Sequence, residues 1–507
     1  MMKKIYMAVW LSLATLLLVA CFEDDSKNDY TELDEIVIEG IADKYSKVSH
    51  QDVLSITPKV TTKAEVEYVW ELWSAGRQTG VIPRPDTIGR AKDLNYEVKE
   101  TPGAYYLVFN VKDVNTGVTT TYKSDFDVVT INSTGWYLLK DEGTGEKYTD
   151  YDFIYDGGRI NNWIAFYNDG KKLKGEAVKS IFISKYSRET GSGLYDYTCM
   201  LAPVAKEEVS LVELNSGIVE RSFESLFFDL PANKDFRNID VSNNGSEVHL
   251  INGNDFYFMN AQGAGSFYPS YGTYEVSDFR LNGLQGPILF DTRSESFMYI
   301  TYGNFNRYIE SSTAPISCNN MDAELVWASS INYRVQTSGV NGFAWLAYSL
   351  MEKHTNPVSH MLVKISAAGY SNSNPIKQVD ALPATSGLIT AEKRAVNADY
   401  GIIYFVKDHK LYKYIIDNQQ ELPILDLPAG EEVTCMQHIA YPNIMSTDFG
   451  SEINRFAIAT YANGKYKVWL HEFDAGDLKP LSEPTFEGNG RVACINYVKG
   501  STSNFLF

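Results

Sequence analysis

The sequence predicts an all-β protein with two parts, a β-sandwich over residues 32–130 and a seven-bladed β-propeller over residues 131–507. Short segments in which apolar and polar residues alternate with a period of two are typical of half-buried strands. Aromatic residues make up 13% of the chain, with 34 tyrosines, and this composition favours strands over helix bundles. In the C-terminal part, hairpin-forming segments recur about every 50 residues, which indicates repeated propeller blades.

Residues 1–20 have the features of a cleaved export signal. Lys3 and Lys4 precede an apolar run that ends at Ala20 and is too short to cross a bilayer comfortably, since a membrane-spanning helix needs about 20 apolar residues. The run ends in Leu18-Val19-Ala20-Cys21, which resembles the bacterial lipobox. That resemblance implies cleavage before Cys21 and a diacylglycerol on its sulfur. The alternative is an ordinary signal peptide followed by a chance cysteine.

Residues 21–31 are expected to form a flexible acidic tether. Phe22-Glu23-Asp24-Asp25 follows the cysteine directly and resembles the surface-export signal of Bacteroidota lipoproteins. The resemblance implies an anchor in the outer membrane and a position facing the cell exterior. A solvated polar linker is the alternative, because such a composition cannot build a core.

Charge excludes one class of partner. Removal of residues 1–20 takes away two lysines and leaves 43 basic against 64 acidic residues, a net charge of −21. Nucleic acid is not an expected partner, because binding it requires a basic surface that releases counterions. The lipid bilayer, reached through acylated Cys21, is the expected partner at the N-terminus, since each buried CH₂ contributes about 0.8 kcal/mol.

The sandwich is predicted from two alternating strands. Val66, Tyr68, Trp70 and Leu72 share one face of the first strand, and mainly acidic residues occupy the other. After a Pro102-Gly103 turn, a second strand has an apolar face made of Tyr105, Leu107, Phe109 and Val111. A Trp-bearing strand followed by Pro-Gly-x-Tyr-x-Leu-x-Phe-x-Val-x-Asp resembles the PKD-type immunoglobulin-like domain. The chain lacks a clear His-x-Tyr before the Pro-Gly turn, so the resemblance is to a divergent, PKD-like branch.

The propeller is predicted from seven hairpins in residues 131–507. Their turn centres are 143, 191, 253, 304, 356, 408 and 463, at intervals of 48, 62, 51, 52, 52 and 55 residues. Asn463-Gly464 suits a type I′ turn. Each blade leaves an apolar face and edges that only neighbouring blades can cover, so the ring must close. Residues 491–498, or residues 128–131 from the opposite end, are the candidates for the closing strand. A pair of stacked β-sandwiches is the alternative architecture.

Motifs for catalysis or metal binding are absent from the sequence. There is no Gly-x-Ser-x-Gly elbow, no His-Glu-x-x-His and no phosphate-cradling loop. His354 and His360 lie six residues apart across a proposed turn, and exposure to solvent explains these polar side chains better than metal ligation. We therefore expect no catalytic residue, no metal and no cofactor. The remaining cysteines match no metal-site spacing and are expected to be buried thiols, with a disulfide left open: Cys199, Cys318, Cys435 and Cys494.

Tryptophans are the other candidates for ligand contact. Trp136, Trp163 and Trp345 have the chemistry to stack on sugars or to hold peptide side chains. Packing inside or between blades is the simpler explanation for each of them. The sequence therefore assigns no ligand-binding residue.

Three features together resemble the PKD-like family of Bacteroidota lipoproteins: Asp-Tyr-Thr-Glu-Leu-Asp-Glu-Ile at residues 29–36, the PKD-like strands, and Thr-Gly-Trp-Tyr-Leu-Leu-Lys at residues 134–140. Members are typically encoded beside SusC/SusD-type importers. The resemblance implies a non-catalytic accessory protein that captures oligopeptides or glycans together with such a transporter and its companion surface lipoproteins. The alternatives are a surface hydrolase of peptides or glycans and an adhesion or structural module.

Overall fold

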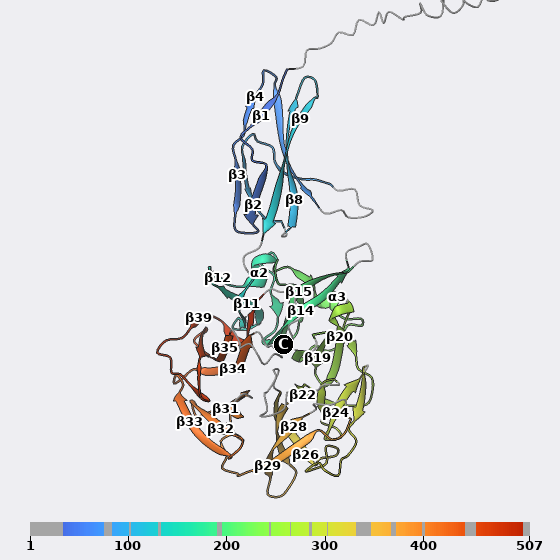
Figure 1. Ribbon diagram of the computed structural model, residues 1–507, viewed down its shortest axis with the longest axis vertical. Helices are drawn as coiled ribbons and strands as arrows, with labels where there is room; N and C mark the ends of the chain where they lie inside the picture. Colours follow the sequence, from blue (N-terminus) through green and yellow to red (C-terminus); the bar gives the residue numbers. More distant parts are fainter. Residues whose placement is uncertain are drawn as a thin grey trace, which may run out of the picture.

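The computed structural model describes residues 34–75, 84–100, 103–129, 133–189, 195–242, 245–263, 265–282, 286–301, 303–330, 346–366, 372–397, 401–441 and 453–499. Two bodies are visible, an elongated sandwich and a ring of sheets next to one of its ends (Figure 1). The signal, the tether and Cys21 lie outside the described residues. None of the described helices is both long and apolar enough to span a membrane.

The first body is a β-sandwich, as predicted. One sheet has five strands in the order β2-β9-β8-β5-β6, while β3 pairs with β7 and β1 with β4. Trp70 is fully buried, and its ring lies 4.2 Å from that of Phe109 between centroids. Its indole N–H donates to the carbonyl of Ala91 at 3.1 Å. The strands are Val37–Glu39 (β1), Lys44–Val48 (β2), Val53–Ile56 (β3), Lys59–Thr61 (β4), Val66–Ser74 (β5), Asp86–Gly89 (β6), Leu94–Glu97 (β7), Gly103–Asp113 (β8) and Thr119–Val129 (β9).

The second body is a ring of seven blades, counted over the described residues, and each blade contains a row of four strands. In blade 1 a fifth short strand, Leu173–Lys174 (β13), also pairs with β11. From the inner to the outer strand, blade 1 is Arg491–Val498 (β40), Gly135–Glu142 (β10), Tyr148–Tyr155 (β11) and Gly158–Ile160 (β12). Blade 2 is Ala177–Glu189 (β14), Tyr195–Ala205 (β15), Leu211–Glu213 (β16) and Val219–Arg221 (β17). Blade 3 is Phe236–Val241 (β18), Glu247–Asn252 (β19), Asp255–Asn260 (β20) and Tyr268–Pro269 (β21). Blade 4 is Val276–Leu281 (β22), Ile288–Asp291 (β23), Ser296–Thr301 (β24) and Asn304–Arg307 (β25).

The remaining three blades follow the same pattern. Blade 5 is Ala323–Ser330 (β26), Leu346–Lys353 (β27), Ser359–Ser366 (β28) and Ile376–Leu382 (β29). Blade 6 is Lys393–Asn397 (β30), Ile402–Lys407 (β31), Lys410–Ile415 (β32) and Gln420–Asp426 (β33). Blade 7 is Glu432–Tyr441 (β34), Ile453–Ala462 (β35), Lys465–His471 (β36) and Phe486–Asn489 (β39). The short elements are Trp163–Tyr167 (α2), Leu173–Lys174 (β13), Phe223–Leu226 (α3), Ala261–Gly263 (η1), Phe473–Asp474 (β37) and Asp477–Leu478 (β38).

The ring closes because its last strand completes its first blade. β40 pairs antiparallel with β10, with Gly135 opposite Val498 and Leu138 opposite Ile495. Of the two predicted closing strands, the C-terminal one is therefore correct, whereas Val128 belongs to β9 of the sandwich. Every pair of neighbouring blades shares a buried apolar core, including blades 7 and 1, where Leu138 and Tyr466 meet. The propeller prediction is confirmed, and the stacked-sandwich alternative is wrong.

The predicted hairpins exist, although they are not equivalent to one another. In five blades they join the second and third strands, but in blade 2 they join β14 to β15 and in blade 4 β24 to β25. Asn304 is the first residue of β25 and not a turn centre, since the turn ends at Gly303 with φ 76°. Gly191 lies outside the described residues. Asn463 and Gly464 have φ of 51° and 79°, as a type I′ turn requires.

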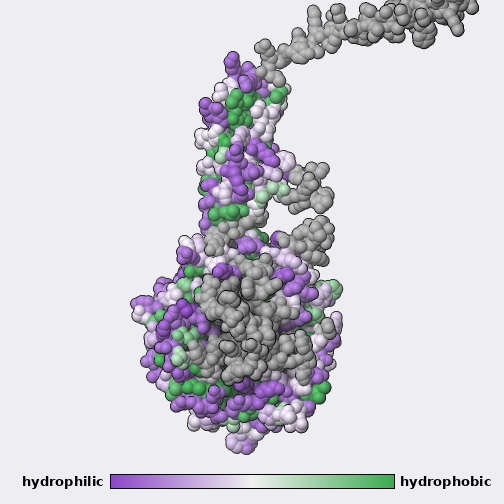
Figure 2. All heavy atoms as spheres, viewed as in Figure 1, coloured by the Kyte–Doolittle hydropathy of each residue, from purple (hydrophilic) through white to green (hydrophobic). Residues whose placement is uncertain are grey.

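The sandwich contacts the ring at its rim beside blade 1. The His50 ring, between β2 and β3, lies 5.3 Å from the ring of Tyr167 in α2 between centroids. β1 lies at the end of the sandwich away from the ring, and β9 leads into the ring (Figure 1). Hydrophilic residues predominate along the rim of the ring opposite the sandwich (Figure 2), in keeping with the acidic composition.

Candidate ligand-binding site

A central channel of about 380 Å³ runs between the inner strands of the ring. Cavities of about 300–1,000 Å³ are usual for small-molecule sites. All seven inner strands contribute to its wall, because each blade turns its first strand toward the axis. Small side chains leave the centre open, among them Ser180, Ala328, Ser329, Ser330, Ala395 and Ala440.

One carboxylate of the wall holds two cations from the neighbouring blades. Asp240 on β18 lies 3.4 Å from Nζ of Lys179 on β14 and 3.4 Å from Nη1 of Arg280 on β22, measured from its Oδ2. Burial alone would raise the pKa of Asp240, but the two cations hold it below its usual range. Lys179 also donates to Oδ1 of Asn238 at 3.0 Å. Blades 2, 3 and 4 are thus linked by charge at the channel wall.

Arg280 is a buried cation whose hydrogen bonds are incomplete. Its side chain is 2% exposed, and Nη1 donates to Oδ1 of Asn282. Its buried Nε–H has no acceptor among the described residues. Burial lowers the pKa of Arg280, and Asp240 opposes this shift. A buried guanidinium N–H without an acceptor is costly, so this wall favours an additional acceptor.

Arg394 on β30 is a third cation of the channel wall. Its guanidinium donates to the carbonyl oxygens of Leu388 at 2.8 Å and Ile389 at 2.6 Å. None of the described carboxylates forms an ion pair with it, and burial lowers its pKa. Its positive charge is therefore not neutralised by the wall.

The rest of the polar wall is neutral. Gln437 on β34 donates to the carbonyl of Ile495, and its Oε1 accepts the Ile495 N–H at 3.3 Å. His438 contacts Asn454 at 2.6 Å between Nε2 and Oδ1. Among the described residues, the wall thus carries three cations and one carboxylate in a chain whose net charge is −19. In chemical terms, it offers hydrogen-bond donors and a surplus of positive charge.

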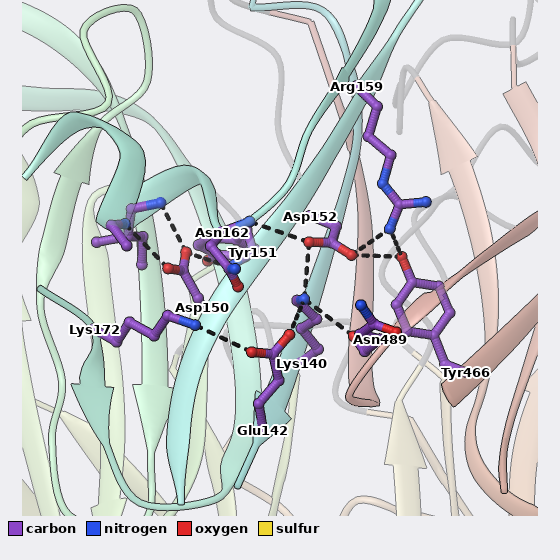
Figure 3. Close-up of polar contacts among 12 residues, drawn as sticks. Lys140, Glu142, Asp150, Tyr151, Asp152, Arg159, Asn162, Lys172, Tyr466 and Asn489 are labelled. Atoms are coloured by element: carbon purple, nitrogen blue, oxygen red, sulfur yellow. Dashed lines mark hydrogen bonds and ion pairs between the residues drawn. The ribbon is translucent and has the colours of Figure 1, made fainter. Parts of the chain in front are cut away.

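A second polar cluster joins blades 1 and 7 (Figure 3). Asp152 on β11 is fully buried and accepts bonds from Lys140 Nζ at 3.0 Å, Tyr466 OH at 2.7 Å and Arg159. Arg159 also donates to the carbonyl of Glu487 in blade 7. Lys140 contacts Asn489 O at 3.0 Å. The partners come from both sides of the closing junction, so the cluster stabilises the closed ring.

The same strand carries a second buried carboxylate. Asp150 accepts the backbone N–H groups of Ile164 at 2.7 Å and Ala165 at 3.0 Å, at the start of α2, and that of Tyr151 at 2.7 Å. Burial raises the pKa of Asp150 to about 6, and these three N–H groups oppose the shift. Asp150 therefore holds α2 against blade 1, next to the contact with the sandwich.

The structure places two of the three tryptophans named from the sequence in packing roles and each of the two histidines beside a carboxylate. Trp163 is buried in the core between blades 1 and 2, and Trp136 lies 5.0 Å from Tyr497 between ring centroids. Trp345 lies outside the described residues. His354 and His360 each face a different glutamate, and no group of three potential metal ligands occurs in the described part of the chain.

The four cysteines within the described residues are free and buried, in agreement with the thiol interpretation. The open disulfide alternative does not occur in the structure. Burial raises the pKa of the Cys318 thiol to about 12 and that of Cys494 above its usual range. Such thiols are poor nucleophiles, because the thiolate is the reactive form.

Sequence reasoning missed the charged residues of the channel wall. Lys179, Asp240, Arg280 and Arg394 lie on first strands that also carry other polar residues, such as Arg237 on β18 and Asp278 on β22. No local pattern therefore singles them out, and they are recognised only after the inner strand of each blade is known.

Comparisons with known proteins bear on the N-terminal part and on the fold. Residues 21–179 match the PKD-like family. No curated protein sequence matches the chain. A quinoprotein alcohol dehydrogenase-like protein of Bacteroides thetaiotaomicron is 12% identical with a TM-score of 0.39, over 90% of this chain and 95% of that one. The extracellular domain of a one-component system protein of the same organism is 9% identical with a TM-score of 0.36, over 91% and 70%.

A third solved structure, apo AztD of Citrobacter koseri, is 11% identical with a TM-score of 0.31, over 86% of this chain and 99% of that one. The family match covers the sandwich, the strands β10, β11 and β12 of blade 1, and the first residues of β14. The N-terminal part of this all-β chain is therefore similar to the PKD-like family.

Proposed function

We propose that the chain is a lipid-anchored, non-catalytic binding protein of the outer surface of a bacterial outer membrane. In this proposal it serves as an accessory to a SusC/SusD-type importer and captures oligopeptides or glycans. The observation that carries the binding role is the preformed channel, whose wall takes side chains from all seven inner strands. A rigid, concave site with few convergent polar groups is what small-molecule recognition requires.

The sandwich fits the role of a spacer between the anchor and the ring. Cys21 precedes β1, which lies at the end of the sandwich away from the ring (Figure 1). β9 has 11 residues and leads into the ring, so the sandwich adds about 36 Å between the two at about 3.3 Å per residue. A spacer of this length supports a ring held clear of the headgroups.

The anchor is tested with Cys21→Ala and with proteinase treatment of intact cells. We expect the variant to remain uncleaved or to leave the membrane fraction, and external proteinase to remove the wild-type protein. Phe22→Ala is a matched control beside the cysteine. Unchanged membrane association of Cys21→Ala would refute the anchor, and complete protection from proteinase would place the protein on the inner side of the membrane.

The accessory role is tested by affinity capture of the full-length protein from detergent-solubilised outer membranes. We expect a SusC/SusD-type pair to co-purify. Turnover assays on peptide and glycan libraries examine the non-catalytic role. Release of product that depends on a residue of the ring would contradict it.

A further inference from the structure

We infer that the central channel is an anion site that binds the carboxylate of a small acidic sugar. This inference rests on the proposed binding function and specifies the chemical class of its ligand. The charges of the wall are its starting point. Lys179, Arg280 and Arg394 are opposed by Asp240 alone among the described lining residues, and Asp240 pairs with the first two, so the wall carries a surplus of two positive charges.

The surplus charge is not explained by the composition of the chain. With a net charge of −19, acidic residues are the ones expected at a randomly chosen surface. A concave wall of one sign concentrates field lines and raises the local concentration of oppositely charged solutes. The channel is therefore a positive site in a negative protein.

One arginine of the wall has a donor without a described acceptor, and another has a charge without a described counter-ion. Arg280 is almost fully buried, and its Nε–H has no acceptor among the described residues. Arg394 uses two carbonyl oxygens but meets no described carboxylate. A guanidinium group presents its N–H donors in a planar fork that fits a carboxylate.

The form of the wall favours an acidic sugar over an amino acid or a dipeptide. Such zwitterions carry an ammonium group, and the one described carboxylate of the wall, Asp240, already pairs with two cations. A sugar acid has no ammonium group, and its hydroxyls match neutral polar side chains such as Ser329 and Ser330. The volume of about 380 Å³ suits a mono- or disaccharide.

The test is calorimetric titration of the full-length mature protein in detergent with four probes: galacturonate, galactose, inorganic phosphate and dialanine. We expect galacturonate to bind with an affinity that falls as sodium chloride rises, because salt screens the charges. Galactose is expected to bind at least about tenfold more weakly, since it forms no charge-assisted bond.

Two variants locate the site in the channel. Arg394→Gln and Lys179→Gln are each expected to weaken galacturonate binding at least about tenfold, the usual effect of removing a charge-assisted contact. Lys410→Gln is the matched control, because it removes one positive charge from the same blade as Arg394 at an exposed ion pair with Asp426. It should leave the affinity unchanged. A thermal melt of each variant confirms that the ring remains folded.

The outcomes are separable from those of the proposed function. Equal binding of galactose and galacturonate, tighter binding of phosphate or dialanine, or normal binding by both channel variants would overturn the acidic-sugar assignment while leaving a binding protein. Absence of binding by all four probes also overturns it. Surface exposure and importer capture test the proposed function independently.

Discussion

Removal of the Asp152 carboxylate is expected to loosen the ring at its closing junction. Asp152 is fully buried and accepts bonds from Lys140, Arg159 and Tyr466. In Asp152→Ala, the buried ammonium group of Lys140 still has two partners, the Glu142 carboxylate at 2.5 Å and the carbonyl oxygen of Asn489. Tyr466 and Arg159 lose their common acceptor between blades 1 and 7.

Removing one partner of a buried ion pair costs about 3–5 kcal/mol. We expect the lower end, about 3 kcal/mol, because Glu142 stays with Lys140. For a domain larger than 200 residues, each kcal/mol shifts the melting temperature by about 2 °C, so the ring transition should fall by about 6 °C.

Calorimetric melts of the full-length protein measure this shift. Tyr466→Phe is the matched control, since it keeps the carboxylate and removes only the hydroxyl that donates to Asp152 and accepts from Arg159, two hydrogen bonds that together should contribute about 2 kcal/mol. The double variant Lys140→Met with Asp152→Leu should recover much of the loss, because apolar replacement of a buried pair is often neutral. A loss below about 1 kcal/mol in Asp152→Ala would refute the fastening role.

Three further predictions concern other parts of the ring. The four buried cysteines should not react with a thiol reagent at pH 8 until denaturant is added, and rapid labelling of the native protein would contradict their burial. Gly464→Ala should destabilise the ring by about 1 kcal/mol, because φ is 79° there, whereas Gly145→Ala in an open loop should not, as urea titrations can show. The raised pKa of Asp150, about 6, gives stability that is complete below pH 4 and is lost as pH rises through 6. Urea titrations measure the free energy of unfolding at each pH. Between pH 4.5 and pH 7 this free energy should fall less, or rise more, in Asp150→Asn than in the wild type. An equal change with pH in both proteins would contradict the raised pKa.

The fold was predictable because its signals are local. Alternation in β5 and β8 and turn residues such as Asn463-Gly464 are dictated by backbone geometry and by which face is buried. The blade count was predictable for a weaker reason. The hairpins of blades 2 and 4 join other strands of the blade than the hairpins of the remaining five blades do. Seven turns therefore predicted seven sheets, but not the position of each hairpin within its sheet.

The cluster at Asp152 was not predictable, because its members are brought together only by closure. Lys140 and Asn489 are separated by 349 residues, and Asp152 and Tyr466 by 314. The sequence contains two candidate strands for closure, and only the choice of β40 brings blade 7 against blade 1. No short-range sequence pattern indicates which of the two strands closes the ring.

The charged residues of the channel have two possible roles that the structure separates. Inter-blade cores are apolar, so folding alone does not require charge on an inner strand, and departures from the local pattern mark constrained or functional positions. Lys179, Asp240 and Arg280 link three adjacent blades, and stability alone is a sufficient reason for their presence. Arg394 links no carboxylate among the described residues, so a fastening role does not explain its charge. The affinity of Arg394→Gln for galacturonate, and not its melting temperature, is therefore the measurement that decides whether the channel is an anion site.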